Sequence, residues 1–247
     1  MPKTIPSWLA SKYFTLLSHF SLLPFTTGEA RTVLHSEKAP LFLHKMYSYG
    51  WVDKVERGTY RIVHPLIALM ESSGLAWRDK VKDRERLPVL ELAVAKLFEA
   101  LGSRLESIVL FGSLPAGRVK PESDIDLLVV ARDLPEKYSE RTSIIREVVS
   151  SKLMDGIILH NWKSRGVYSD LDVLLIDVKE AGATHPFYLD LTRDCVIIYD
   201  RNGLMTRKIS EVRDRLEKMG AKRFEEPDGS WYWILAPEAE AAKRLEL

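Results

Sequence analysis

The first 50 residues carry apolar side chains at helical spacing, which predicts three short helices. The first is expected over residues 8–20, and the second ends at Leu34 with Thr27 as its expected N-cap. The third is expected over residues 41–49, because Pro40 suits the first turn of a helix. The chain is therefore expected to open with a helical segment.

Apolar and polar residues alternate over residues 51–63, which is typical of a β-hairpin. The alternation breaks at Arg57-Gly58, where we expect the turn. Three short helices followed by a hairpin is the order of a winged helix-turn-helix domain, and Tyr-Gly-Trp-Val at residues 49–52 resembles that family. The resemblance covers about residues 5–75 and implies a small winged-helix domain.

A second pattern begins after residues 77–86, which are almost wholly charged and predict a domain boundary or a solvated helix start. An amphipathic helix is expected over residues 87–101, where Gly102 closes it. Strand-like apolar runs then recur at residues 107–111, 124–131, 171–176 and 195–199, with a polar helical stretch over residues 136–152. Strands that alternate with helices predict an α/β sheet covered by helices.

The last part of the chain predicts a helix over residues 204–219. A turn at Pro227-Asp228-Gly229 then leads into an aromatic strand at residues 231–235. A short helix is expected in the final Ala- and Glu-rich stretch. We therefore divide the chain into residues 1–80, 81–200 and 201–247, the last as an extension.

Composition and charge narrow the classes of protein that remain. The 247 residues carry 36 Lys and Arg against 35 Asp and Glu, which excludes binding to nucleic acid by bulk positive charge alone. Residues 1–80 nevertheless hold 10 basic and 6 acidic side chains.

A single cysteine, Cys195, excludes an internal disulfide and favours a cytoplasmic protein. No apolar run approaches the ~20 residues that span a bilayer, so no membrane contact is expected. Because glutamine is absent and only two asparagines occur, the composition is typical of a hyperthermophile.

The motif with the clearest chemistry is Gly112-Ser113, followed after ten residues by Asp124-Ile125-Asp126. Asp124 and Asp126 stand two apart at the start of an apolar strand, so both carboxylates leave the same face. Their charges repel each other unless a cation lies between them, and Mg²⁺ prefers one or two carboxylates completed by water and phosphate oxygens. A glycine after a strand lets backbone N–H groups approach an anion, to which the hydroxyl of Ser113 can donate.

A third acid is expected on the next strand, since two-metal phosphoryl transfer needs a further carboxylate. Asp172 opens the strand at residues 171–176 and shares a face with Leu174 and Ile176. Asp170 points the same way from one step outside the strand, and Asp177 falls on the opposite face. Asp172 is the preferred candidate, with Asp170 as the alternative.

Gly-Ser, a ten-residue gap, Asp-x-Asp and a later strand acid together resemble the DNA polymerase β-like nucleotidyltransferase superfamily, particularly its minimal members. The resemblance implies a mixed-sheet nucleotidyltransferase fold over about residues 85–200. It also implies two Mg²⁺ ions, or Mn²⁺, held by Asp124, Asp126 and Asp172, and an NTP whose phosphates meet Gly112 and Ser113. The expected reaction transfers a nucleoside monophosphate to a hydroxyl and releases pyrophosphate.

Two further residues of the glycine loop follow from the same resemblance. Gly117 fits the glycine that the family places after Gly-Ser. Minimal members often carry an arginine before that glycine, whereas Pro115 and Ala116 stand there in this chain and Arg118 follows it. Gly117 and Arg118 are therefore candidate nucleotide-binding residues. The acceptor stays open between an RNA end, a protein hydroxyl and a small molecule.

Basic residues on the third helix and the hairpin are candidates for nucleic-acid contact, namely Lys45, Lys54, Arg57 and Arg61. Winged helices also dock proteins, so the partner is a nucleic acid or a protein. Two alternatives to a free-standing enzyme remain: a DNA-binding regulator whose transferase domain senses nucleotide, and a toxin–antitoxin protein that acts with a HEPN-type partner. The fold class expected overall is an α/β (α+β mixed sheet) nucleotidyltransferase domain preceded by a small winged-helix domain.

Overall fold

The N-terminal part of the protein is a helical unit with a small sheet. The computed structural model describes residues 4–226 and 231–236. Three helices and three strands form this unit: α1 (Ser7–Phe20), β1 (Phe25–Thr26), α2 (Thr27–Leu34), α3 (Ala39–Ser48), β2 (Val52–Glu56) and β3 (Thr59–Ile62). The strand order is β1-β3-β2, and both pairings are antiparallel. The predicted order of three helices and a hairpin is therefore present, while its membership of the winged helix-turn-helix family stays a prediction.

The N-cap of α2 lies one residue earlier than expected. Thr26, not Thr27, caps the helix, because its hydroxyl accepts from the Glu29 amide at 3.2 Å. The Glu29 carboxylate in turn accepts from the Thr26 amide at 2.7 Å. This reciprocal pair needs a glutamate three residues after the cap, and Glu29 stands at that distance only from Thr26.

The charged stretch at residues 77–86 is only partly solvated, because exposed residues such as Asp79 and Arg84 stand among buried ones. It follows α4 (Pro65–Ser72), contains the short helix η1 (Arg78–Lys80) and leads into α5 (Leu87–Leu101). Trp77, Arg78 and Arg86 are 1%, 5% and 2% exposed. The segment therefore lies at the contact between the N-terminal unit and α5, where buried arginines need acidic partners.

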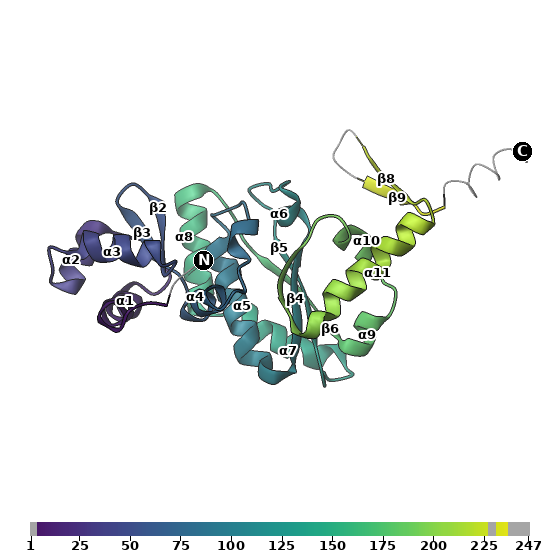
Figure 1. Cartoon of the computed structure of the whole chain (residues 1–247), viewed down its shortest axis with the longest axis horizontal. Coiled ribbons are helices and arrows are strands. Elements are labelled where there is room, and N and C mark those ends of the chain that lie inside the picture. Colours follow the sequence, from purple (N-terminus) through teal and green to yellow (C-terminus); the bar gives the residue numbers. More distant parts are fainter. Residues whose placement is uncertain (1–3, 227–230, 237–247) are drawn as a thin grey trace, which may run out of the picture.

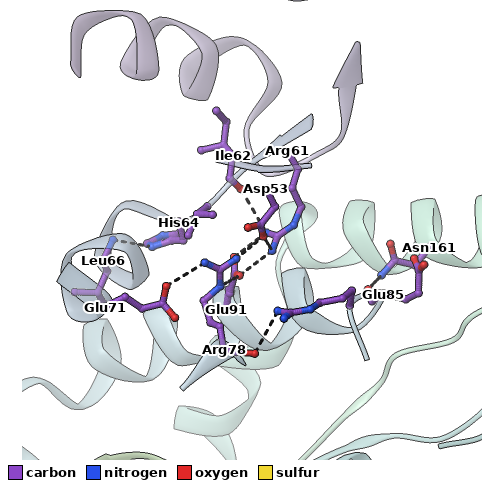
Figure 2. Close-up of polar contacts among 12 residues, drawn as sticks. Asp53, Arg61, Ile62, His64, Leu66, Glu71, Arg78, Glu85, Glu91 and Asn161 are labelled. Atoms are coloured by element: carbon purple, nitrogen blue, oxygen red, sulfur yellow. Dashed lines mark hydrogen bonds and ion pairs between the residues drawn. The ribbon is translucent and has the colours of Figure 1, made fainter. Parts of the chain in front are cut away.

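Those partners form a buried charge cluster, shown in Figure 2. Glu91 of α5 accepts from Arg61 of β3 and from Arg78 of η1. Asp53 of β2 pairs with both arginines, and Glu71 of α4 pairs with Arg78 at 3.1 Å. The cluster holds the hairpin, α4 and α5 together, because separating any of them would leave a buried charge without its partner.

The C-terminal part is built around a mixed sheet in the order β6-β5-β4-β7. Its strands are β4 (Leu105–Phe111), β5 (Ile125–Ala131), β6 (Leu171–Asp177) and β7 (Val196–Asp200). β4 pairs antiparallel with β5 and β7, whereas β5 and β6 are parallel. The predicted strands and the mixed α/β architecture are confirmed, with bounds that differ by one or two residues.

Helices cover both faces of this sheet (Figure 1). The parallel crossover between β5 and β6 contains α7 (Tyr138–Val149) and α8 (Lys152–Arg165), which pack with α5 on one face. The other face carries α9 (Val178–Gly182), α10 (Tyr188–Leu191) and α11 (Leu204–Lys218). Side chains of β5 alternate between the two, since Leu127 and Val129 pack in one core and Leu128 and Val130 in the other.

The polar helical stretch predicted over residues 136–152 is confirmed as α7, but the crossover also holds a second helix, α8, which the sequence does not predict. The chain breaks at Ser150-Ser151, where the Ser151 hydroxyl accepts from the Met154 amide at 3.1 Å and caps α8. The periodicity does not reveal α8, because this helix buries only Met154, Ile157 and Asn161. These three positions produce a weak apolar pattern.

Short elements complete the described chain. They are η2 (Gly102–Arg104), α6 (Ser113–Ala116), η3 (Arg201–Gly203) and the hairpin of β8 (Lys222–Glu225) and β9 (Trp231–Ile234). The turn expected at Pro227-Asp228-Gly229 and the expected terminal helix lie outside the described residues. Among residues 4–226 and 231–236, no helix has the length and apolar character needed to cross a membrane.

Candidate active site

The two acidic strands of the sheet start side by side at one edge. In the parallel pairing of β5 and β6, Asp126 lies opposite Asp172. Neighbouring strands run about 4.8 Å apart, so two side chains in register share one face at close range. Asp124 precedes β5 by one residue, and Phe111 at the end of β4 lies opposite Asp126. The structure thus brings together the three predicted acids and the end of the Gly-Ser strand.

Gly112 lies directly against one of these carboxylates. A Cβ atom at this position would stand 1.9 Å from Oδ2 and 2.8 Å from Cγ of Asp126. Its φ of +78° also disfavours any residue with a side chain. Ser113 begins α6 immediately afterwards, and Gly117 ends that helix in a left-handed conformation. The glycine is therefore required for the loop to approach the acidic strand.

Negative charge accumulates at this edge of the sheet. Burial, followed by the neighbouring charges of Asp172 and Asp124, raises the pKa of Asp126 to about 6. A carboxyl group perturbed by burial and by like charges is typical of functional sites. The charges of Asp172 and Asp124 therefore oppose the ionisation of Asp126 unless a cation binds between them.

The donor set fits a hard divalent cation. Within residues 4–226 and 231–236, no group of three or more His, Cys, Asp or Glu side chains stands close enough to hold a metal ion by itself. The three acids offer only carboxylate oxygens, and the repulsion among them is relieved by a cation. Mg²⁺ commonly takes one or two carboxylates and completes its shell with water and substrate phosphates. The arrangement suits that mode of binding rather than a site closed by the protein.

The other two strand acids have structural partners. Asp170 accepts from the Leu171 amide at 2.8 Å, and its carbonyl accepts from the Ile125 amide at 2.8 Å. Asp177 caps α9 by accepting from the Lys179 amide at 2.9 Å. The register with Asp126 therefore favours Asp172 over Asp170 as the third acid.

Arg118 faces the C-terminal hairpin. Its guanidinium lies 3.6 Å from Asp194 and 3.8 Å from Glu225, and 4.9 Å from the ring centre of Trp231. No local pattern predicts this contact, because β8 and β9 lie more than 100 positions after the glycine loop. The hairpin therefore borders the loop that carries Gly117 and Arg118.

The basic residues of the N-terminal unit have different surroundings. Lys54 and Arg57 are exposed on the hairpin, while the ammonium group of Lys45 lies 5.0 Å from the ring centre of Trp8. Arg61 is 4% exposed and donates to Glu91, so the prediction that it contacts nucleic acid is corrected (Figure 2). Arg61 and its neighbour Ile62 are both buried on β3, and the sequence does not reveal the acidic partner of Arg61 on α5.

A groove of about 1020 Å³ separates the hairpin from α8. Lys54 lines it on the hairpin side, and His160 and Arg165 line it on the α8 side. α8 ends at Arg165, a few residues before the start of β6. The groove thus lies between the N-terminal unit and the second crossover helix of the sheet.

Paired strand acids beside a glycine loop, on a mixed sheet covered by helices, define an enzyme of the nucleotidyl-transfer class. The profile of the nucleotidyltransferase domain family matches residues 93–243. The chain belongs to this family, and the predicted transfer of a nucleoside monophosphate is confirmed at the level of the enzyme class. Arg86 and the whole N-terminal unit lie before the matched residues.

Comparison with individual proteins gives more distant similarities. The chain is 24% identical over 133 residues to "Putative protein adenylyltransferase MJ1305" of Methanocaldococcus jannaschii, which covers 53% of this chain and 83% of that protein. A spectinomycin adenyltransferase structure from Enterococcus faecialis is 15% identical, covers 54% of this chain and 66% of that one, and gives a TM-score of 0.35. A complex of the MNT antitoxin with a tri-AMPylated HEPN toxin from Shewanella oneidensis is 16% identical. The match covers 55% of this chain and 92% of that one, with a TM-score of 0.27.

Proposed function

We propose that the protein transfers AMP from ATP to a hydroxyl group of a partner protein, in a reaction that depends on Mg²⁺. The observation that carries this proposal is the parallel register that sets Asp126 opposite Asp172, beside Gly112. The name of the relative from M. jannaschii makes ATP and a protein hydroxyl the first donor and acceptor to test.

The residues at this edge of the sheet have different roles in the reaction. Asp124, Asp126 and Asp172 would hold two Mg²⁺ ions, with Mn²⁺ as a substitute. Bound there, the ions would supply positive charge to the phosphates and would favour ionisation of the attacking hydroxyl. The backbone N–H groups after Gly112 and the hydroxyl of Ser113 orient the triphosphate, with Gly117 allowing the loop to turn. Arg118 adds positive charge to the leaving phosphates.

The bond changes are those of an in-line displacement. The acceptor oxygen forms a bond to the α-phosphorus of ATP while the bond to the β-phosphate oxygen breaks, which releases pyrophosphate. The proton of the acceptor hydroxyl passes to a carboxylate oxygen of Asp172. When the acceptor hydroxyl binds at this carboxylate it excludes water, so AMP is transferred to the acceptor and ATP is not hydrolysed.

The N-terminal unit completes the proposal. We infer that residues 1–80 are a winged-helix domain that presents the acceptor to residues 81–200, and that residues 201–247 form an extension. The groove between the hairpin and α8 supports this role, because it offers a binding surface between the N-terminal unit and a helix of the catalytic domain. Lys45, Lys54 and Arg57 would contact an acidic partner surface or a nucleic acid.

The test uses the full chain, ATP labelled on the α-phosphate, Mg²⁺ and a cell extract. Label should enter a protein band, and Asp124→Asn combined with Asp126→Asn should abolish it. Asp170→Asn is the matched control, because an amide oxygen can still accept from the Leu171 amide. Label that survives in the double variant refutes the proposed site.

The same experiment separates the alternative functions. Label that nuclease removes and protease does not identifies an RNA acceptor. Label that appears only when a HEPN-type protein is supplied identifies a toxin–antitoxin pair. Tight, sequence-selective binding to duplex DNA without any transfer identifies a regulator.

A further inference from the structure

One buried arginine connects the two loops from which the acidic strands begin. The side chain of Arg86, 2% exposed, lies just before α5 and donates to four backbone carbonyls. Nε donates to the Ser123 carbonyl at 3.0 Å. Nη2 donates to the carbonyls of Lys120 at 2.7 Å, Pro121 at 2.9 Å and Tyr168 at 3.0 Å.

These carbonyls belong to two separate segments of the chain. Residues 120–123 lead directly into Asp124 and β5, while Tyr168 precedes β6 and Asp172 by a few residues. The segments also bond to each other, since the Tyr168 amide donates to the Pro121 carbonyl at 2.9 Å. The guanidinium therefore reinforces a contact that holds the two strand starts together.

The surroundings of Arg86 hold the guanidinium in a fixed orientation. Nη1 donates to Oδ2 of Asp83 at 2.7 Å, which balances the buried charge. Oδ1 of Asp83 accepts from the amides of Glu85 and Arg86 at 2.9 and 3.0 Å. The side-chain amide of Asn161 on α8 donates to the Glu85 carbonyl at 2.7 Å. The backbone and the guanidinium of Arg86 are thus both held by Asp83, and Asn161 holds the neighbouring Glu85 carbonyl.

Only arginine supplies this set of contacts. Its planar group offers five N–H donors in a fixed fork, whereas lysine offers three donors around a point charge. Carbonyl acceptors that lose a buried donor carry a desolvation cost, so the loops would move apart to find water. The distance between the carboxylates of Asp126 and Asp172 depends on where those loops lie.

We propose that Arg86 is a positioning residue, which fixes the spacing of the two carboxylate-bearing strand starts and thereby sets the affinity of the edge for a divalent cation. This inference rests on the proposed function of the same edge. It adds a buried residue that lies before the matched part of the family.

The experiment compares Arg86→Lys with Arg141→Lys in the full chain. Arg141 is a matched control, because it is 7% exposed and donates to the Pro135 carbonyl and to Glu180, beyond the opposite ends of β5 and β6. Binding of Mn²⁺ is measured by electron paramagnetic resonance with a non-hydrolysable ATP analogue present. Arg86→Lys should weaken Mn²⁺ binding about tenfold or more, as removal of an outer-shell partner does, and Arg141→Lys should leave it unchanged.

Hydrogen exchange gives a readout that needs neither metal nor activity. The amides of Tyr168 and Ile125 should exchange about tenfold faster in Arg86→Lys, because the loops that carry their acceptors open more often. In a transfer assay the same variant should need more Mg²⁺ for half-maximal rate, while KM for ATP at saturating Mg²⁺ stays close to that of the wild type.

Each outcome has a defined meaning. Mn²⁺ binding within twofold of the wild type in Arg86→Lys, or equal weakening in Arg141→Lys, overturns the inference. A wild type that binds no Mn²⁺ also overturns it. If Arg86→Lys does not fold by circular dichroism, Asp83→Asn decides, since it keeps an oxygen for the backbone amides and removes the charge beside Nη1. If Arg86→Lys weakens Mn²⁺ binding as expected but the wild type transfers no nucleotide, the inference stands and the proposed function is refuted.

Discussion

Removing the charge of Glu91 should destabilise the protein far more than removing an exposed glutamate. The Glu91 side chain is fully buried and accepts three hydrogen bonds from two arginines, at 2.8, 2.8 and 2.7 Å. The side chains of Arg61 and Arg78 are 4% and 6% exposed, so neither can recover its hydration by a small movement. Glu91→Gln keeps the size of the side chain and replaces one acceptor with a donor that faces a guanidinium.

The expected magnitude follows from the positive charge that Glu91→Gln leaves unbalanced. A buried charge left without its partner costs about 3–5 kcal/mol. Because Asp53 still neutralises part of the positive charge, we expect destabilisation at the lower end, about 3 kcal/mol. This corresponds to a fall of about 6–12 °C in Tm for a chain of this size.

Urea unfolding followed by tryptophan fluorescence measures the difference. Glu37→Gln is the control, because Glu37 is 89% exposed and pairs with Arg31 at 3.6 Å. The control should change the free energy of unfolding by less than about 1 kcal/mol. Equal destabilisation in the two variants would refute the view that the cluster stabilises the contact between the N-terminal unit and α5.

Three further outcomes are expected. Gly112→Ala should fold but lose transfer and Mn²⁺ binding, because its Cβ would displace the Asp126 carboxylate. Gly156→Ala on α8 is the control, because open space surrounds its Cβ on an ordinary helical backbone, and a radiolabel assay should find transfer within a few-fold of the wild type. Asp126→Asn should stabilise the metal-free protein in urea unfolding. The rise in the Asp126 pKa from 3.8 to about 6 corresponds to about 3 kcal/mol, which partial exposure reduces to about 1 kcal/mol. That gain should be present above pH 6 and absent below pH 4, where the aspartate is protonated in both states. For Asp53, burial raises the pKa but two neighbouring guanidinium groups outweigh it and hold the pKa below its usual value. Its contribution to stability should therefore be present near neutral pH and disappear as the pH falls through the folded-state pKa, and Asp53→Asn should flatten that acid limb in thermal melts.

Local patterns predict the elements on which the site rests. Asp126 and Asp172 each stand at the start of an apolar strand, and strand periodicity alone puts Asp177 on the opposite face. Gly112 is recognisable because Gly-Ser at the end of an apolar run is a signal for a turn. These features depend on residues next to one another in the chain, so sequence is sufficient for them.

Contacts between distant residues are not predictable in the same way. Arg61 and Arg86 resemble surface charges in the sequence, yet both are buried against acids or carbonyls from other elements. The contact of Arg118 with Trp231 likewise depends on how the hairpin folds back. Charged side chains are buried only when a partner is supplied by the tertiary structure, and the sequence does not show that partner.

The parallel pairing of β5 with β6 sets different limits on insertions in different parts of the chain. The crossover through α7 and α8 can gain or lose residues on its surface while Asp126 and Asp172 keep their partners. A single residue inserted within β6 before Asp172 would turn that carboxylate to the opposite face of the sheet. Length variation among related chains should therefore concentrate between the acidic strands and be absent within them.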